Sequence, residues 1–304
     1  MIKIRDLEYY NNLKLDIYLP DSDTFDLLIY FHGGGLESGG KEEIIPSSDY
    51  LVERNIAIIS INYRLYPFAK YPDFILDAVK GIKWCIENIN KYGECKDIYI
   101  GGTSAGAYIT QMLCFNSYYY KKENIDPLKI KGYIHDAGQP TVHFNVLKEK
   151  GIDSRRIIVN EDAPLYYVGI EKEYPRMLFI VSTNDLENRY EQTMLMLRTL
   201  KHFNYDESKI ELKVMEGKHC EYVSKVIDNE SVFGKIIYEF IKGKGTVVPI
   251  NRWKFIDLFF YSSFSKSFKK IDYIRQYNII FYIQPISFRS SQIFKINFIG
   301  KYFF

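Results

Sequence analysis

The residues best suited to chemistry lie in a glycine-flanked segment near the centre of the chain. Residues 98–107 read IYIGGTSAGA, in which Gly102, Ser104 and Gly106 fit the pattern G-x-S-x-G. An apolar run precedes the serine, and a run compatible with a helix, residues 105–115, follows it. A strand, a sharp turn and a helix are the setting in which such a serine acts as a nucleophile. A turn of small residues also produces the pattern by chance, so the motif alone leaves both interpretations open.

A serine hydroxyl needs a base to take its proton, and histidine is the side chain that titrates near neutral pH. Five histidines are present, and His219 is the one in a loop directly after the last predicted strand. We therefore expect His219 to be the base. The other four lie in a glycine run (His32), at the end of a predicted strand (His135), in an irregular segment (His143) and in a predicted amphipathic helix (His202).

The imidazole in turn needs a carboxylate that fixes its tautomer and stabilises its charged form. Asp185 lies in the loop after the preceding predicted strand, and Glu187 is its nearest rival. A solvated loop carboxylate is the alternative interpretation of either residue. We favour Asp185 because it lies closer to the strand end. The resulting chain order, Ser104 then Asp185 then His219, is the order found in α/β sheets of the hydrolase type.

An attacked carbonyl becomes an oxyanion and needs N–H donors that are already in place. The backbone N–H of Ala105 is one candidate, and those of Gly33 and Gly34 are the others. These glycines belong to the run His32-Gly-Gly-Gly35, which directly follows the apolar run 27–31. A flexible turn is the alternative interpretation of the run, but its place after a buried strand favours an oxyanion hole.

Apolar runs alternate with helical patterns over about 240 residues, which predicts an α/β fold with a mostly parallel sheet and helices on both faces. Residues 2–10 and 13–19 are expected to form a half-exposed antiparallel pair at one edge. Further strands are expected at 27–31, 56–61, 97–104, 130–135, 177–181 and 210–215, and helices at 47–54, 73–92, 105–115, 189–204 and 232–241. Chemistry collects at the carboxyl ends of such strands, where all the candidate residues lie.

The chain is predicted to have a main domain at 1–243, with 136–174 as an insertion or cap. Residues 244–304 differ in kind: they hold ten Lys/Arg, two acids and 17 of the 50 aromatic residues. A basic, aromatic segment at a membrane surface is one hypothesis for this tail. We favour a poorly folded or aberrant segment, because no amphipathic stripe is present.

Composition describes a globular protein, with 304 residues, 47% hydrophobic and 26% charged. The formal net charge of +2 gives no reason to expect a nucleic-acid partner. The four cysteines form no C-x-x-C pair and are interpreted as reduced thiols. The charged N-terminus does not resemble a signal peptide, and no apolar stretch is long enough to span a membrane. We therefore expect a cytoplasmic protein.

The set of motifs resembles the α/β-hydrolase fold, most closely its hormone-sensitive-lipase-like and acetyl-esterase branch. The matching pieces are His32 to Gly35, Tyr63-Arg-Leu65 with Pro67, Tyr71-Pro72, Gly102 to Gly106, Asp185 and His219. The resemblance implies hydrolysis of small-molecule esters through an acyl-enzyme, without cofactor or metal. It also implies the roles given above: Ser104 as nucleophile, His219 as base, Asp185 as acid, and Gly33, Gly34 and Ala105 as oxyanion donors.

The sequence departs from this family in two places. Thr103 stands where many members have an aspartate, a change we expect to be tolerated. N-terminal cap helices are missing, which leaves the acyl length undetermined. Two alternatives remain: a peptidase of the same fold, which usually carries a gating domain, and a non-catalytic binding protein, which commonly lacks the serine or histidine.

Overall fold

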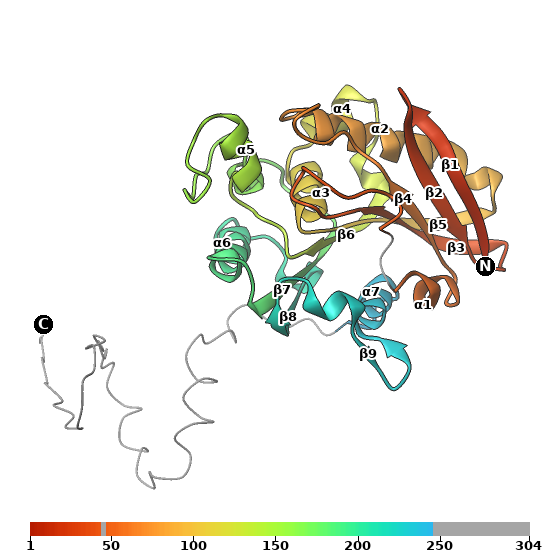
Figure 1. Cartoon of the computed structure of the whole chain (residues 1–304). Coiled ribbons are helices and arrows are strands. Elements are labelled where there is room, and N and C mark those ends of the chain that lie inside the picture. The colour runs from red at the N-terminus through yellow and green to blue at the C-terminus, as the bar shows by residue number, and fades with distance from the viewer. Residues whose placement is uncertain (44–46, 246–304) are drawn as a thin grey trace, which may run out of the picture. The chain divides into compact units, whose positions relative to one another are not determined.

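An eight-stranded sheet is the framework of the computed structural model, which describes residues 1–43 and 47–245 (Figure 1). Its strand order is β1-β2-β4-β3-β5-β6-β7-β8. All neighbours from β4 to β8 pair in parallel, whereas β2 runs antiparallel to both β1 and β4. The strands are β1 (Ile2–Tyr10), β2 (Leu13–Leu19), β3 (Thr24–Phe31), β4 (Ile56–Ile61), β5 (Glu94–Thr103), β6 (Ile130–Asp136), β7 (Arg176–Asn184) and β8 (Ile210–Lys218).

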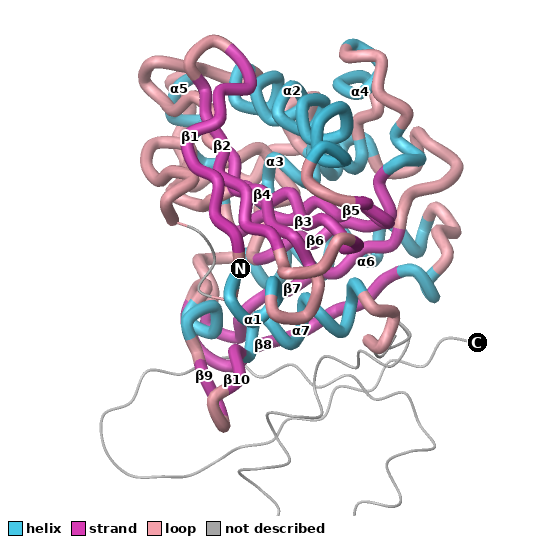
Figure 2. Tube along the Cα trace, turned by 90° about the vertical axis from the view of Figure 1, so that its right-hand side faces the viewer, coloured by secondary structure: helices cyan, strands magenta, loops and turns pink. Residues whose placement is uncertain are grey.

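Helices cover both faces of this sheet, as predicted. Figure 2 shows α2 and α4 on one side and α1 and α7 on the other. Each side has its own apolar cluster: side chains of α2, α3 and α6 share the first, and side chains of α1 and α7 share the second. The helices are α1 (Ser48–Val52), α2 (Asp73–Asn88), α3 (Ala105–Phe115), α4 (Tyr118–Lys122), α5 (Phe144–Glu149), α6 (Arg189–His202) and α7 (Val232–Ile241).

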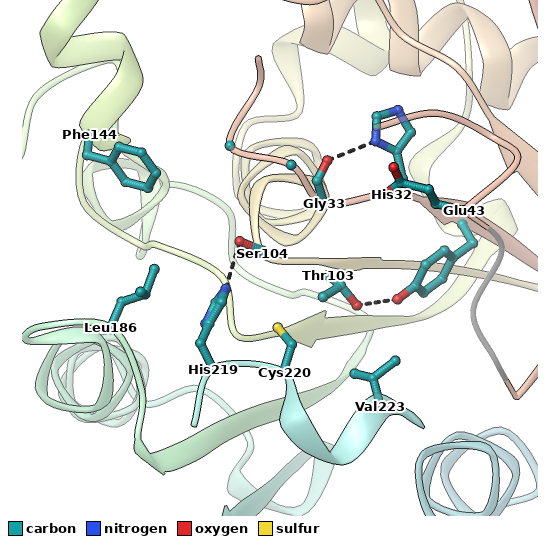
Figure 3. A pocket seen from close by; sticks show the side chains of 13 residues that line it. His32, Gly33, Glu43, Thr103, Ser104, Phe144, Leu186, His219, Cys220 and Val223 are labelled. Carbon is teal, nitrogen blue, oxygen red and sulfur yellow. Dashed lines mark hydrogen bonds between the residues drawn. The ribbon is translucent and has the colours of Figure 1, made fainter. Parts of the chain in front are cut away.

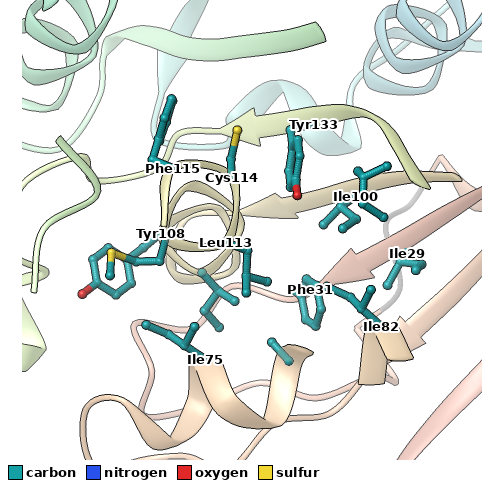
Figure 4. Close-up of a cluster of buried hydrophobic side chains, with 14 of the residues drawn as sticks. Ile29, Phe31, Ile75, Ile82, Ile100, Tyr108, Leu113, Cys114, Phe115 and Tyr133 are labelled. Atoms are coloured by element: carbon teal, nitrogen blue, oxygen red, sulfur yellow. The ribbon is translucent and has the colours of Figure 1, made fainter. Parts of the chain in front are cut away.

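The helix after the serine is the most deeply buried helix that the structure describes. Every residue of α3 is buried, and Leu113 packs with Phe31 and Ile100 in the first cluster (Figure 4). A helix buried all round loses its packing on every side if it shifts, so its position is tightly determined. Because α3 begins directly after Ser104, this packing also fixes the serine.

The antiparallel pair at the sheet edge differs from the expectation in one respect. Only β1 is largely exposed, whereas β2 is buried from Leu15 to Leu19 on both faces. The alternation of polar and apolar residues was misleading at two positions. Asp16 is buried because the ammonium of Lys41 lies 2.8 Å from its carboxylate, and Tyr18 is buried in the second cluster.

The segment predicted as an insertion or cap, 136–174, contains α5 and a 3₁₀ turn, Pro164–Tyr167. The domain boundary at 243 remains a prediction, as does the nature of the tail, which lies outside the described residues from 246 onward. Apart from the 3₁₀ turns, three elements of the described residues were not predicted: α4, α5 and a small hairpin of Val226–Ile227 with Glu230–Ser231. Within the described ranges, no helix is long and apolar enough to cross a membrane.

Candidate active site

Ser104 lies at a sharp corner between β5 and α3. Its backbone has φ of +55° and ψ of −111°, a conformation that costs free energy for any residue with a side chain. The flanking glycines make the corner possible. A Cβ on Gly106 would lie 2.1 Å from the carbonyl oxygen of Phe31, and a Cβ on Gly102 would lie 2.6 Å from the backbone of Gly106. The strained turn predicted from G-x-S-x-G is therefore present.

The structure brings Ser104, His219 and Asp185 into one hydrogen-bonded series, of which Figure 3 shows the bond between Ser104 and His219. Ser104 Oγ lies 3.0 Å from His219 Nε2, and His219 Nδ1 lies 2.5 Å from Asp185 Oδ1. With the imidazole proton on Nδ1, the ring donates to Asp185 and accepts from the serine hydroxyl. This is the arrangement in which a histidine can take a proton from the serine.

Asp185 is held by more than the histidine. Its carboxylate also accepts backbone N–H bonds from Ser182 and from Leu186, at 3.1 and 2.8 Å. Burial alone raises the pKa of Asp185, but the hydrogen bond and charge of His219 and the two N–H donors outweigh it and bring the pKa below its usual value. The carboxylate is thus ionised where the imidazole needs it. Glu187, the rival considered from the sequence, is exposed.

The glycine run after β3 lies against the serine. A Cβ on Gly33 would lie 3.5 Å from Ser104 Cβ, and Gly33 and Gly34 both line the pocket that contains Ser104. The carbonyl of Gly34 accepts two backbone bonds from the following turn, so the peptide is fixed. Within the described part of the chain, no hydrogen bond uses the N–H of Gly33, Gly34 or Ala105. These three N–H groups are available to an oxyanion.

The remaining histidines have other surroundings. His135 and His143 are fully buried, and burial lowers the pKa of His135 to about 3 and that of His143 well below its usual value. His32 stacks on Tyr63 with ring centroids 4.3 Å apart, and burial lowers its pKa as well. His202 ends α6. Of the five histidines, all of which lie in the described residues, only His219 is hydrogen-bonded to Ser104.

A pocket of about 410 Å³ opens above Ser104 and His219. Phe144 and Leu186 lie toward one end of it, and Cys220 and Val223 toward the other (Figure 3). Sequence reasoning missed the residues that complete the site. Phe144, Tyr30 and Val223 belong to no motif, and only the folded chain brings them to the serine.

Part of the chain is similar to known proteins. Residues 15–147 match the family model BD-FAE. Probable carboxylesterase 7 of Arabidopsis thaliana is 33% identical over 141 residues, which are 40% of this chain and 43% of that protein. Kynurenine formamidase of Danio rerio is 31% identical over 121 residues, 39% of each chain. Carboxylesterase NlhH of Mycobacterium tuberculosis is 29% identical over 106 residues, 34% of this chain and 33% of that one. The chain thus matches less than half the length of these curated relatives.

Solved structures extend the likeness to most of the fold. Esterase B of Lactobacillus Rhamnosis superposes with a TM-score of 0.64 at 16% identity, over 79% of this chain and 85% of that one. Thermogutta terrifontis esterase 2 superposes with a TM-score of 0.65 at 20% identity, over 81% of this chain and 96% of that one. The α/β-hydrolase fold is therefore confirmed. So is the predicted resemblance to esterases of the hormone-sensitive-lipase-like branch.

Proposed function

We propose that this α/β-hydrolase-fold protein is a serine carboxylesterase that cleaves small acyl esters, with acetyl esters favoured, through an acyl-enzyme. The observation that carries the proposal is the hydrogen-bonded series of Ser104, His219 and Asp185, at 3.0 and 2.5 Å, on the floor of a pocket. The similarity to carboxylesterases over the first half of the chain supports the same reaction class.

In the first half of the reaction, Ser104 Oγ bonds to the ester carbonyl carbon while its proton passes to His219 Nε2. The tetrahedral oxyanion accepts hydrogen bonds from Gly33, Gly34 and Ala105, each worth on the order of 3 kcal/mol to the transition state. The carbon–oxygen bond to the alcohol then breaks, and the alcohol leaves with the proton from His219. Water repeats the sequence on the acyl-enzyme, and the carboxylic acid leaves.

Substrate size follows from the pocket. A volume of about 410 Å³ is near the lower end of the range for small-molecule sites, which favours a short acyl group with a small alcohol. Phe144 and Leu186 give the pocket an apolar end that suits an acyl chain. We therefore infer that the substrates are small esters, and no cofactor takes part in the proposed steps.

The alternatives make different predictions for substrates. A peptidase of the same fold cleaves amide anilides, and a binding protein turns over neither substrate. The likeness to kynurenine formamidase adds an aryl formamide as a further substrate to try. A hydrogen-bonded serine and histidine argue against the binding protein, because that role has no need of this geometry.

The test is a kinetic panel on the full chain and on Ser104→Ala. We expect turnover of 4-nitrophenyl acetate and butyrate to exceed that of the octanoate, an acetyl-peptide anilide and an aryl formamide. Ser104→Ala should lower kcat by at least a thousandfold, because the other groups of such a site act only through the nucleophile. Higher activity on the anilide would favour the peptidase. No turnover of any member would favour the binding protein.

A further inference from the structure

A second buried carboxylate lies behind the serine. Asp136 is the last residue of β6 and is fully buried, with Thr103 beside it on β5 and Ile180 on β7. Its backbone carbonyl accepts the N–H of Ser104 at 2.8 Å. The peptide of Asp136 therefore holds the corner at which Ser104 is placed, and its side chain is close enough to affect the same corner.

Three hydroxyl groups gather around the Asp136 carboxylate. Thr103 Oγ1 donates to Oδ2 at 2.6 Å, and the hydroxyl of Tyr222 donates to Oδ1. The hydroxyl of Tyr30 is hydrogen-bonded to Thr103 Oγ1 (Figure 3). Because Thr103 gives its one proton to the carboxylate, Tyr30 must be the donor in that bond. Every bond in the cluster thus points toward Asp136 as an ionised acceptor.

These hydroxyls come from the segments that carry the proposed active site. Tyr30 precedes the glycine run by two residues, Thr103 directly precedes Ser104, and Tyr222 follows His219 by three residues in a 3₁₀ turn. One carboxylate therefore joins the oxyanion loop, the nucleophile corner and the loop of the base. Small displacements between such groups cost large factors in rate, because the reacting atoms must meet in one geometry.

We propose that Asp136 is a positioning residue, which aligns Ser104, His219 and the glycine loop through its hydrogen bonds to Thr103 and Tyr222 and, by way of Thr103, to Tyr30. The inference rests on the proposed function for its ester-hydrolysis readout. Asp136 does not touch the reacting atoms, and it acts only through the three hydroxyls. A proton on the carboxyl would turn one oxygen into a donor, so one hydroxyl would have to turn away.

The surroundings of Asp136 decide when that proton binds. Burial raises the pKa of Asp136 to about 6, although the bonds from Thr103 and Tyr222 and the nearby His219 lower it. Titratable groups from three parts of the fold face the cluster. Tyr30 comes from β3, Asp185 and Arg189 come from the loop after β7 and the start of α6, and the segment after β8 contributes His219, Cys220 and Tyr222. Acidification toward pH 5 should therefore break the cluster.

The first experiment removes one hydroxyl, with Tyr222→Phe. Tyr120→Phe is the matched control, because the Tyr120 hydroxyl is equally buried, bonded at 2.6 Å to Tyr133 and absent from the pocket lining. For 4-nitrophenyl acetate, Tyr222→Phe should lower kcat by about tenfold and leave KM within about threefold. Tyr120→Phe should leave both constants unchanged. Wild-type kcat in Tyr222→Phe would overturn the inference.

The second readout needs no ester. Paraoxon reacts when Ser104 Oγ bonds to phosphorus, 4-nitrophenolate leaves and the serine proton passes to His219. Tyr222→Phe should slow this phosphorylation in proportion to its kcat. If the wild type turns over no ester but is phosphorylated faster than Tyr222→Phe, the esterase proposal fails and the positioning role stands. If the wild type and Tyr222→Phe react equally fast with the ester and with paraoxon, the positioning role fails and the esterase proposal is supported.

A pH profile separates positioning from mere structural support. From pH 7 to pH 5, kcat/KM of the wild type should fall more steeply than that of Asp136→Asn, which has no proton to bind there. Parallel profiles of the two proteins would contradict the inference. If Asp136→Asn does not fold, the same comparison is made with Thr103→Val, which removes the hydroxyl bond to the carboxylate, and Thr103→Ser should restore the wild-type slope.

Discussion

At the scale of single residues, Asp185 differs from Glu187 because its carboxylate is hydrogen-bonded to His219. Asp185→Asn keeps the shape but holds the imidazole in the wrong tautomer, and it should lower kcat by about 10³ to 10⁴. Glu187→Gln is the matched control and should keep the wild-type rate, because Glu187 is exposed and outside the hydrogen-bonded series. Steady-state kinetics on 4-nitrophenyl acetate measures both. A large loss of kcat in Glu187→Gln would instead indicate that Glu187 is the carboxylate that orients His219.

Asp136 should also leave a signature in stability. Because its pKa is raised from 3.8 to about 6, the folded chain binds the proton more tightly than the unfolded chain. This contribution to stability is fully present below pH 3.8 and is lost as pH rises through 6. Relative to Asp136→Asn, the free energy of unfolding of the wild type should fall by about 2 kcal/mol between pH 4 and pH 7. Urea unfolding at several pH values measures the difference, and a constant difference would contradict a raised pKa.

The sequence indicated some site residues and not others for a physical reason. Ser104, Asp185 and His219 each follow a predicted strand, so their places at strand ends could be predicted. Asp136 also ends a strand, but a lone aspartate has no partner within the spacing of any motif. Its partners Tyr30 and Tyr222 lie 106 and 86 residues away, and only strand pairing brings them together.

At the scale of elements, α5 shapes the pocket. Phe144 begins α5 and reaches the pocket, while Lys148 of the same helix pairs at 2.7 Å with Glu37 beyond the glycine run. Phe144→Ala should lengthen the apolar end of the pocket and raise the ratio of octanoate to acetate kcat/KM by about tenfold. Phe203→Ala, a half-exposed phenylalanine outside this pocket, is the control. An unchanged ratio in Phe144→Ala would show that the acyl chain lies elsewhere.

The central strands were predictable because most of their residues are buried. Continuous apolar runs predicted β3, β4 and β7, and the apolar spacing of α2 matches its buried face. A short helix such as α4 has too few residues to show a helical spacing of apolar residues. In β2 the pattern itself was misleading, since an ion pair allows Asp16 to be buried. Such pairs depend on distant residues, here Lys41, and no local pattern reports them.

At the scale of the whole molecule, parallel strand pairing is what joins the site. The carboxyl ends of β3, β5, β6, β7 and β8 share one edge, so loops from residues 32 to 219 meet there. Chain order was therefore enough to predict which segments converge. It was not enough to predict pocket volume or acyl length, because these depend on side chains from α5 and the segment after β8.

The central claim is that an acyl group passes through Ser104, and trapping that intermediate tests it most directly. The full chain is mixed with 4-nitrophenyl acetate, quenched in acid within the first turnovers, digested and analysed by mass spectrometry. We predict one acetyl group on the peptide that contains Ser104, and none on that peptide in Ser104→Ala. Acetylation of another residue, with undiminished turnover by Ser104→Ala, would contradict the account.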